Sequence, residues 1–122
     1  MKRILIVDDN PAVRKLVSEI LRERYLLTEA RDGAEALASI HREPPDAVIL
    51  DMMMPVMNGW AFLLRHAALP AALRKPVIVV SGEPSACEDG MRLGAQACLA
   101  KPFDVDRLLT TIEQACQYCQ AC

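Results

Sequence analysis

Short runs of aliphatic residues recur along the chain, and each run is followed by a segment whose apolar residues have helical spacing. A run of about four such residues, ending in a polar residue, is typical of a strand covered on both faces of a parallel sheet. Three strong runs and two weaker ones are Ile4–Val7, Ala47–Leu50, Val77–Val80, Leu26–Ala30 and Ala97–Ala100. The pattern therefore predicts five strands.

The segments between these runs carry start and stop signals of helices. Asn10 is placed as an N-cap with Pro11 at the first helical position, and Asp32 can cap a second helix that ends before Pro44. Asn58 opens a third helix, over Trp60–Ala68. The first helix is predicted to turn one apolar stripe toward the sheet, made of Val13, Leu16, Val17, Ile20 and Leu21.

Two further helices follow. The fourth, around Ser85–Leu93, is weak because Gly90 interrupts it and Gly94 ends it. The fifth begins at Asp104 and is predicted to bury four apolar residues, Val105, Leu108, Leu109 and Ile112. Five alternations of strand and helix predict the α/β class, a doubly wound parallel sheet with helices on both faces and right-handed crossovers.

Composition narrows the class of protein. The chain has 122 residues, of which 52% are hydrophobic and 25% charged, with a formal net charge of −2. These values are those of a globular protein, and the length predicts one domain over residues 1–122 without a second one. No run of lysine and arginine is present, so neither a nucleic acid nor a membrane surface is an expected partner.

The cysteines and the apolar runs bear on the cellular compartment. All five cysteines lie late in the chain: Cys87, Cys98, Cys116, Cys119 and Cys122. An odd number does not suggest a disulfide framework and favours a reducing compartment. No apolar run approaches the length of a signal peptide or a membrane helix. We therefore expect a cytoplasmic protein.

Two histidines and the terminal cysteines could suggest a metal site. His41 and His66 are placed at helix ends beside arginines, without a partner at metal-ligand spacing, and we expect both to be exposed. The CxxCxxC pattern from Cys116 to Cys122 is interpreted as the end of the fifth helix, with Cys116 continuing the stripe of Ile112. Helical steps of three rotate each thiol by about 60° from the last, which does not converge them on one ion.

Polar residues with complementary chemistry follow the predicted strands. The first strand ends in Asp8 and Asp9, the third in Asp51, the fourth in Ser81 and the fifth in Lys101. In an open parallel sheet the ligand site lies beyond the carboxyl ends of the strands. Three crowded carboxylates resist ionisation unless a cation lies among them, and oxygen ligands suit Mg²⁺ or Mn²⁺.

The hydroxyl and the ammonium indicate a ligand beyond the metal. A divalent ion, the Lys101 ammonium and the Ser81 hydroxyl together match a doubly charged phosphoryl group. A carboxylate among them can act as the nucleophile and form an acyl phosphate. The residues alone therefore predict phosphoryl transfer onto an aspartate with Mg²⁺ held beside it.

Four motifs in this order make the chain resemble the receiver domains of two-component response regulators over nearly its whole length. They are Ile4-Leu5-Ile6-Val7-Asp8-Asp9-Asn10, Asp51-Met52-Met53-Met54-Pro55-Val56-Met57-Asn58-Gly59, Val79-Val80-Ser81-Gly82, and Gly94-Ala95 leading to Lys101-Pro102-Phe103. Each motif is a weak signal alone, and their coincidence at strand ends is highly specific. The resemblance implies a flavodoxin-like sheet with strand order 2-1-3-4-5 and five helices.

The resemblance also implies a role for each site residue. Asp51 would be the phospho-acceptor, Asp9 a direct Mg²⁺ ligand, and Asp8 a ligand acting mostly through water. The backbone carbonyl of Met53 would be a further metal ligand. Ser81 would bind a phosphoryl oxygen and move toward it on activation.

Further implications concern Lys101 and the partners. Lys101 would release Asp51 and pair with the phosphoryl group, and the Lys101–Pro102 peptide bond would be cis. The phosphoryl donor would be a histidine kinase or a phosphotransfer protein. The product would be a signalling switch rather than an enzyme, with slow self-dephosphorylation. A downstream protein would bind the face formed by the fourth helix, fifth strand and fifth helix, and a homodimer is left open.

The sequence departs from the family at one switch position. Three residues before the lysine the family usually carries an aromatic residue, and here Cys98 stands there. A thiol has neither the bulk nor the ring for the usual rotamer change, so we predict that this readout is absent, although phosphorylation itself need not suffer.

Three alternative functions differ from this interpretation in the residues they require. A receiver-like interaction module that acts without phosphorylation is the main one, and Cys98 leaves some room for it. A related phosphatase or phosphotransferase would need an acidic residue two positions after the nucleophile, where Met53 stands. A nucleotide-binding or flavin-binding domain would need a glycine-rich loop after the first strand, where Asp8 and Asp9 stand instead.

Overall fold

The computed structural model describes residues 1–121, and for residues 118–121 it describes the backbone alone. Five parallel strands form one sheet in the order β2-β1-β3-β4-β5. The strands are β1 (Arg3–Val7), β2 (Leu26–Ala30), β3 (Ala47–Asp51), β4 (Val77–Ser81) and β5 (Ala97–Ala100). The predicted fold class, the five strands and the strand order are confirmed.

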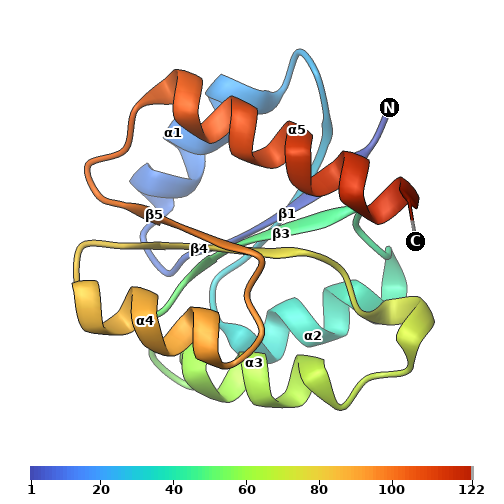
Figure 1. Cartoon of the computed structure of the whole chain (residues 1–122), viewed down its shortest axis with the longest axis vertical. Helices are drawn as coiled ribbons and strands as arrows, with labels where there is room; N and C mark the ends of the chain where they lie inside the picture. The colour runs from blue at the N-terminus through green and yellow to red at the C-terminus, as the bar shows by residue number, and fades with distance from the viewer. Residues whose placement is uncertain (122) are drawn as a thin grey trace.

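Helices cover both faces of the sheet. They are α1 (Pro11–Leu21), α2 (Gly33–Arg42), α3 (Gly59–Ala67), α4 (Pro84–Arg92) and α5 (Val105–Ala121), with a 3-10 turn η1 (Ala71–Leu73). Figure 1 shows α1 and α5 on one face and α2, α3 and α4 on the other. The helices on opposite faces make this a three-layer α/β molecule, as the alternating pattern predicts.

Two separate hydrophobic cores follow from the alternation of side chains along each strand. In β1, Leu5 and Val7 belong to the core that includes Ile40 and Phe62, on the side of α2 and α3. Ile4 and Ile6 belong to the other core, on the side of α1 and α5. Because successive side chains point to opposite faces, a continuous apolar run supplies both cores at once.

The predicted caps form as expected. The side chain of Asn10 accepts a hydrogen bond from Ala12 N, and that of Asp32 accepts one from Glu35 N, each at 2.9 Å. Asn58 caps α3 in the same way. The first three helices therefore begin where the sequence predicts, within one residue.

Two residues predicted to be buried are exposed instead. Leu16 is 53% exposed, because it lies about 100° around α1 from the buried Val17 and therefore at the edge of the stripe. Val105 is 45% exposed and is the first residue of α5. Since helical side chains lean toward the N-terminus, its side chain extends past the start of the helix. Leu108 and Ile112 are buried as predicted.

The prediction that His66 is exposed is wrong. His66 is only 8% exposed, and its ring stacks on Phe62, one turn earlier in α3, with ring centroids 5.6 Å apart. The spacing of four residues places both rings on the inner face of the helix. His66 Nε2 accepts a hydrogen bond from the backbone N–H of Lys75 at 3.1 Å. His41 is exposed, as predicted.

Helix α4 is continuous through Gly90 despite the low helix propensity of glycine. A Cβ atom on Gly90 would lie 2.8 Å from Cγ2 of Val79 in β4. The helix therefore packs against the sheet at a distance that only glycine permits. This close approach explains a residue that the sequence pattern treats as an interruption.

The structure corrects the expectation drawn from the cysteine count. Cys87 in α4 and Cys98 in β5 form a disulfide, with Cα atoms 5.6 Å apart. The pair is 11 residues apart in sequence, and the β4–α4–β5 unit brings it together. Cys116 is buried, as predicted. The predictions for Cys119 and Cys122 lie outside the described part of the structure, because neither the side chain of Cys119 nor any part of Cys122 is described.

Over the described residues, no helix is both long and apolar enough to cross a membrane.

Candidate metal and phosphoryl site

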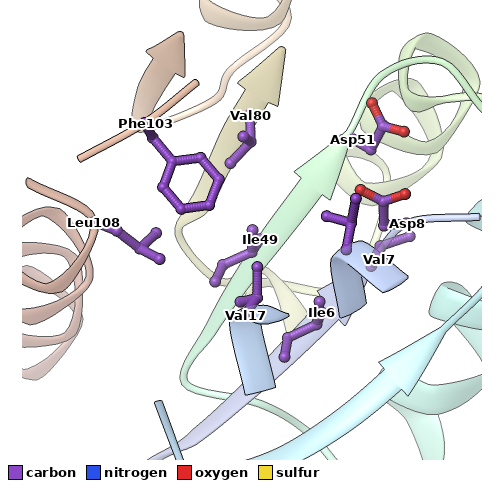
Figure 2. Close-up of a pocket in the computed structure, with 10 residues that line it drawn as sticks. Ile6, Val7, Asp8, Val17, Ile49, Asp51, Val80, Phe103 and Leu108 are labelled. Carbon is purple, nitrogen blue, oxygen red and sulfur yellow. The ribbon is translucent and has the colours of Figure 1, made fainter. Parts of the chain in front are cut away.

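Three carboxylates meet at the carboxyl ends of β1 and β3. Asp8 and Asp9 directly follow β1, and Asp51 is the last residue of β3. One oxygen of each lies within 4.8 Å of the others. Figure 2 shows the Asp8 and Asp51 carboxylates side by side at the ends of these neighbouring strands. The topology thus assembles the acidic cluster that the sequence predicts.

Asp8 is held in place from three directions. The backbone N–H of Asn10 donates to its carboxylate at 2.9 Å, and the Lys101 ammonium lies 3.6 Å from the other carboxylate oxygen. The resemblance implies an ion pair of Lys101 with Asp51, whereas the structure shows this ion pair with Asp8. Arg14 donates to its backbone carbonyl at 2.7 Å. Asp8 is buried, so these contacts offset part of the cost of removing its charge from water.

The surroundings of Asp51 oppose the charged form of its carboxyl. Burial raises the pKa of its carboxyl above the usual value of 3.8, and the neighbouring charge of Asp8 raises it further. Lys101 and the backbone N–H of Met53, 3.3 Å from a carboxylate oxygen, act in the opposite direction without cancelling the effect. The site therefore holds more negative charge than its own cations balance.

Ser81 and Lys101 reach the same edge from β4 and β5. The backbone N–H of Lys101 donates to the carbonyl of Ser81 at 2.9 Å, which aligns the two strand ends. The Ser81 hydroxyl accepts a hydrogen bond from Glu83 N at 3.1 Å. This hydrogen bond joins the Ser81 side chain to the N-cap residue of α4. The Lys101–Pro102 bond is cis, as the resemblance implies.

The loop between β3 and α3 carries the residue implied as a backbone ligand. Met53 is in this loop, two residues after Asp51, with its side chain mostly exposed. Val56, farther along, has a φ of 66°. A β-branched residue rarely adopts this left-handed conformation, so the loop is locally strained.

Two residues that shape the site were missed by sequence reasoning. Gly59 ends the motif that begins at Asp51, and a Cβ there would lie 2.6 Å from the Cα of Met52. Its place in the motif was the available signal. Arg14 lies on a polar helix face, where it also pairs with Glu29 at 3.0 Å. Nothing in its sequence context indicated the contact with Asp8.

The arrangement defines what the site can do chemically. An oxygen-only cluster with excess negative charge suits a divalent cation of the Mg²⁺ type. The half-buried Asp51 carboxylate belongs to this cluster, and a carboxylate can act as a nucleophile. Ser81 and Lys101 supply a hydroxyl and a cation at the neighbouring strand ends.

Comparison with known proteins agrees with this geometry. A family model described as the response regulator receiver domain matches residues 4–113. Sporulation initiation phosphotransferase F of Bacillus subtilis is 34% identical over 114 residues, covering 93% of this chain and 92% of that protein. Chemotaxis protein CheY of the same species is 33% identical, with coverage of 92% and 95%.

A solved structure extends the comparison to the site. The receiver domain of a sensor histidine kinase from Pseudomonas aeruginosa is 28% identical and superposes with a TM-score of 0.87. The match covers 95% of this chain and 98% of that one. That structure carries a magnesium ion coordinated in its active site cleft.

Proposed function

The chain belongs to the response regulator receiver domain family of two-component systems, and on that premise we propose that Asp51 accepts a phosphoryl group in a Mg²⁺-dependent reaction. The donor is a histidine kinase or a phosphotransfer protein. The observation that carries the proposal is the position of Asp51, half-buried at the end of β3 and within 4.8 Å of Asp8 and Asp9. The chain then acts as a signalling switch, not as an enzyme that turns over a substrate.

The acidic cluster fits a magnesium ion. Asp8, Asp9 and Asp51 offer carboxylate oxygens close together, and burial together with the charge of Asp8 raises the pKa of Asp51. With the backbone carbonyl of Met53 these residues would hold the ion, and water would fill the other positions. When bound, the ion neutralises phosphoryl oxygens and so admits an anion to an acidic site.

Asp51 performs the covalent step. A carboxylate oxygen of Asp51 attacks phosphorus, a new O–P bond forms, and the bond from phosphorus to the nitrogen of the donor histidine breaks. The donor imidazole leaves with the electron pair of the broken bond. Asp8 and Asp9 cannot substitute readily, because Asp8 is tied to Asn10 and Lys101 and Asp9 lies on the exposed side.

Ser81 and Lys101 respond to the new group. Lys101 exchanges its ion pair with Asp8 for one with a phosphoryl oxygen. The Ser81 hydroxyl leaves Glu83 N and donates to another phosphoryl oxygen. Both changes pull on the strand ends that precede α4 and α5, so the loops after β3 and β4 shift between two populations.

The downstream partner binds the face formed by α4, β5 and α5. This face begins at Ser81 and Lys101, the two residues that change partners on phosphorylation. Slow hydrolysis of the acyl phosphate resets the switch.

The test is the intact mass of the protein after incubation with a small acyl-phosphate donor, with and without Mg²⁺. We expect one phosphoryl adduct that depends on Mg²⁺ and is absent from Asp51→Asn. The variant Asp106→Asn changes an exposed aspartate of α5 outside the cluster and should be phosphorylated normally. Failure of every donor to label the folded protein in Mg²⁺, or equal labelling of Asp51→Asn, would overturn the proposal.

A further inference from the structure

The disulfide between Cys87 and Cys98 connects two elements beside the proposed switch. Cys87 belongs to the first turn of α4, and Cys98 lies on β5, paired in register with Val79 of β4. Their Cα separation of 5.6 Å is in the centre of the range found for protein disulfides. The backbone therefore brings the two residues close enough for this bond.

Both sulfur-bearing residues are reachable from solvent. Cys87 and Cys98 are partly exposed, whereas Cys116 is buried in the core between the sheet and α5. The pair lines an open hollow of about 560 Å³ at the surface, large enough to admit a small thiol compound. Other residues of this hollow are Ser81, Gly82, Phe103 and Arg107.

The bond restrains a helix that is otherwise weakly held at its start. The N-cap residue of α4, Glu83, makes no side-chain capping bond. The helix contains Gly90, and its beginning is joined to β4 through the hydrogen bond between Glu83 N and Ser81. A covalent link from Cys87 to β5 thus fixes α4 a few residues beyond the point where Ser81 acts.

We propose that Cys87 and Cys98 form a reversible disulfide clamp between α4 and β5, which low-molecular-weight thiols and disulfides of the glutathione class open and close. The clamp sets how far α4 responds to events at Ser81. This effect on the response of α4 rests on the proposed function, whereas the formation of the disulfide does not. The clamp also gives Cys98 a role at the position where an aromatic residue is expected in the family.

Closing the clamp is a balanced thiol–disulfide exchange. The Cys87 thiolate attacks one sulfur of glutathione disulfide and releases one glutathione thiolate. The Cys98 thiolate then attacks the Cys87 sulfur of the mixed disulfide and releases the second. The two protein thiols lose two electrons and two protons, and one glutathione disulfide becomes two glutathione thiols.

The first experiment tests the bond without phosphorylation. The full chain carrying Cys119→Ser and Cys122→Ser is equilibrated at several ratios of glutathione to glutathione disulfide, alkylated and digested. We expect a Cys87–Cys98 cross-linked peptide whose fraction follows the ratio in both directions. Absence of this peptide at every ratio, a cross-link to Cys116 in its place, or a bond that reduced glutathione cannot open would overturn the clamp.

The second experiment tests the effect on α4. Hydrogen exchange of the α4 amides should be about tenfold slower in the oxidised than in the reduced protein. In Cys87→Ser, and in Cys87→Ala as a second variant, the rates should equal those of the reduced protein under both conditions. Equal exchange in oxidised and reduced wild-type protein would overturn the restraint.

Phosphorylation of the two forms tests the coupling. Both should give the Asp51 adduct, while the increase in α4 exchange on phosphorylation should be several-fold smaller in the oxidised protein. An equal increase in both forms would refute the coupling. An adduct missing from both forms would refute the proposed function and the coupling with it, while the first two experiments still decide the clamp.

Discussion

At the scale of single residues, Asp51 and His66 are two groups whose charged form is opposed by their surroundings. Asp51 lies beside two other carboxylates, and His66 lies in the core against Phe62. In both cases burial disfavours the charged form, which raises the pKa of the acid and lowers that of the base. The two residues therefore affect the pH dependence of stability in opposite directions.

Replacing Asp51 with asparagine should stabilise the protein when no divalent cation is present. The raised pKa means that the contribution of Asp51 to stability is fully present below 3.8 and is lost as pH rises through the folded-state pKa. At pH 7 the variant should gain about 1 kcal/mol in the free energy of unfolding, the size of a near-surface charge repulsion. Urea denaturation in EDTA measures it, and a loss of stability would contradict the argument.

His66 should make the protein less stable as pH falls below neutral. Burial lowers the pKa of His66 in the folded state, so as pH falls the unfolded chain is protonated first. The contribution of His66 to stability is therefore present above the usual pKa of 6.5 and is lost as pH falls through the folded-state pKa. Denaturation at pH 7.5 and 5.5 should show a smaller loss in His66→Gln, which keeps an acceptor for Lys75 N. His41→Gln, at an exposed position, is the control for the removal of a histidine.

At the scale of elements, α4 is the helix in which local preference and packing disagree. Its sequence has a proline at the start and a glycine in the middle, yet it covers β4 and is tied to β5. Gly90 provides the close approach to Val79, and the Cys87–Cys98 bond supplies a restraint that propensity does not. An element of this kind is suited to move when its anchors change.

Gly90→Ala should therefore destabilise the protein although alanine is the better helix former. The propensity gain of about 1 kcal/mol is opposed by an overpacking cost of about 1–3 kcal/mol against a stiff β-branched side chain. In a Val79→Ala background the same substitution should become stabilising. A double-mutant cycle by urea denaturation measures the coupling, and an additive result would show that Gly90 and Val79 are not in close contact.

At the scale of the whole molecule, the site exists only when the sheet is assembled. Asp8, Asp51, Ser81 and Lys101 come from four strands or strand ends that are distant in sequence. The two cores on either side of the sheet fix these ends relative to one another. A ligand that needs several of these residues can bind only the folded chain, so binding and stability are linked.

Magnesium should accordingly raise the stability of the protein. At a Mg²⁺ concentration tenfold above the Kd, the free energy of unfolding should increase by about 1.4 kcal/mol. The increase should be reduced in Asp9→Asn, since this exposed carboxylate belongs to the cluster. Thermal unfolding with Mg²⁺ and with EDTA measures the change, and Asp106→Asn should behave as wild type. Equal unfolding in both buffers would exclude a magnesium site in the folded protein.

Much of this protein is determined by local features of the sequence. The aliphatic runs determine the positions of the strands, because a strand that is covered on both faces carries apolar residues at successive positions. Asn10, Asp32 and Asn58 set the helix starts, because a capping side chain acts on backbone groups two or three residues away. The acidic residues of the site could also be recognised from the sequence. They directly follow predicted parallel strands, and the carboxyl ends of such strands lie at one edge of the sheet.

Other features were decided only by the tertiary structure. The burial of His66, the exposure of Leu16 and the close approach at Gly90 depend on which neighbour each side chain meets. The ion pair of Lys101 with Asp8 and the Cys87–Cys98 bond join residues from different elements. Local sequence carries the preferences of a segment for itself, whereas a contact between segments depends on distances that exist only after the sheet and its helices have packed.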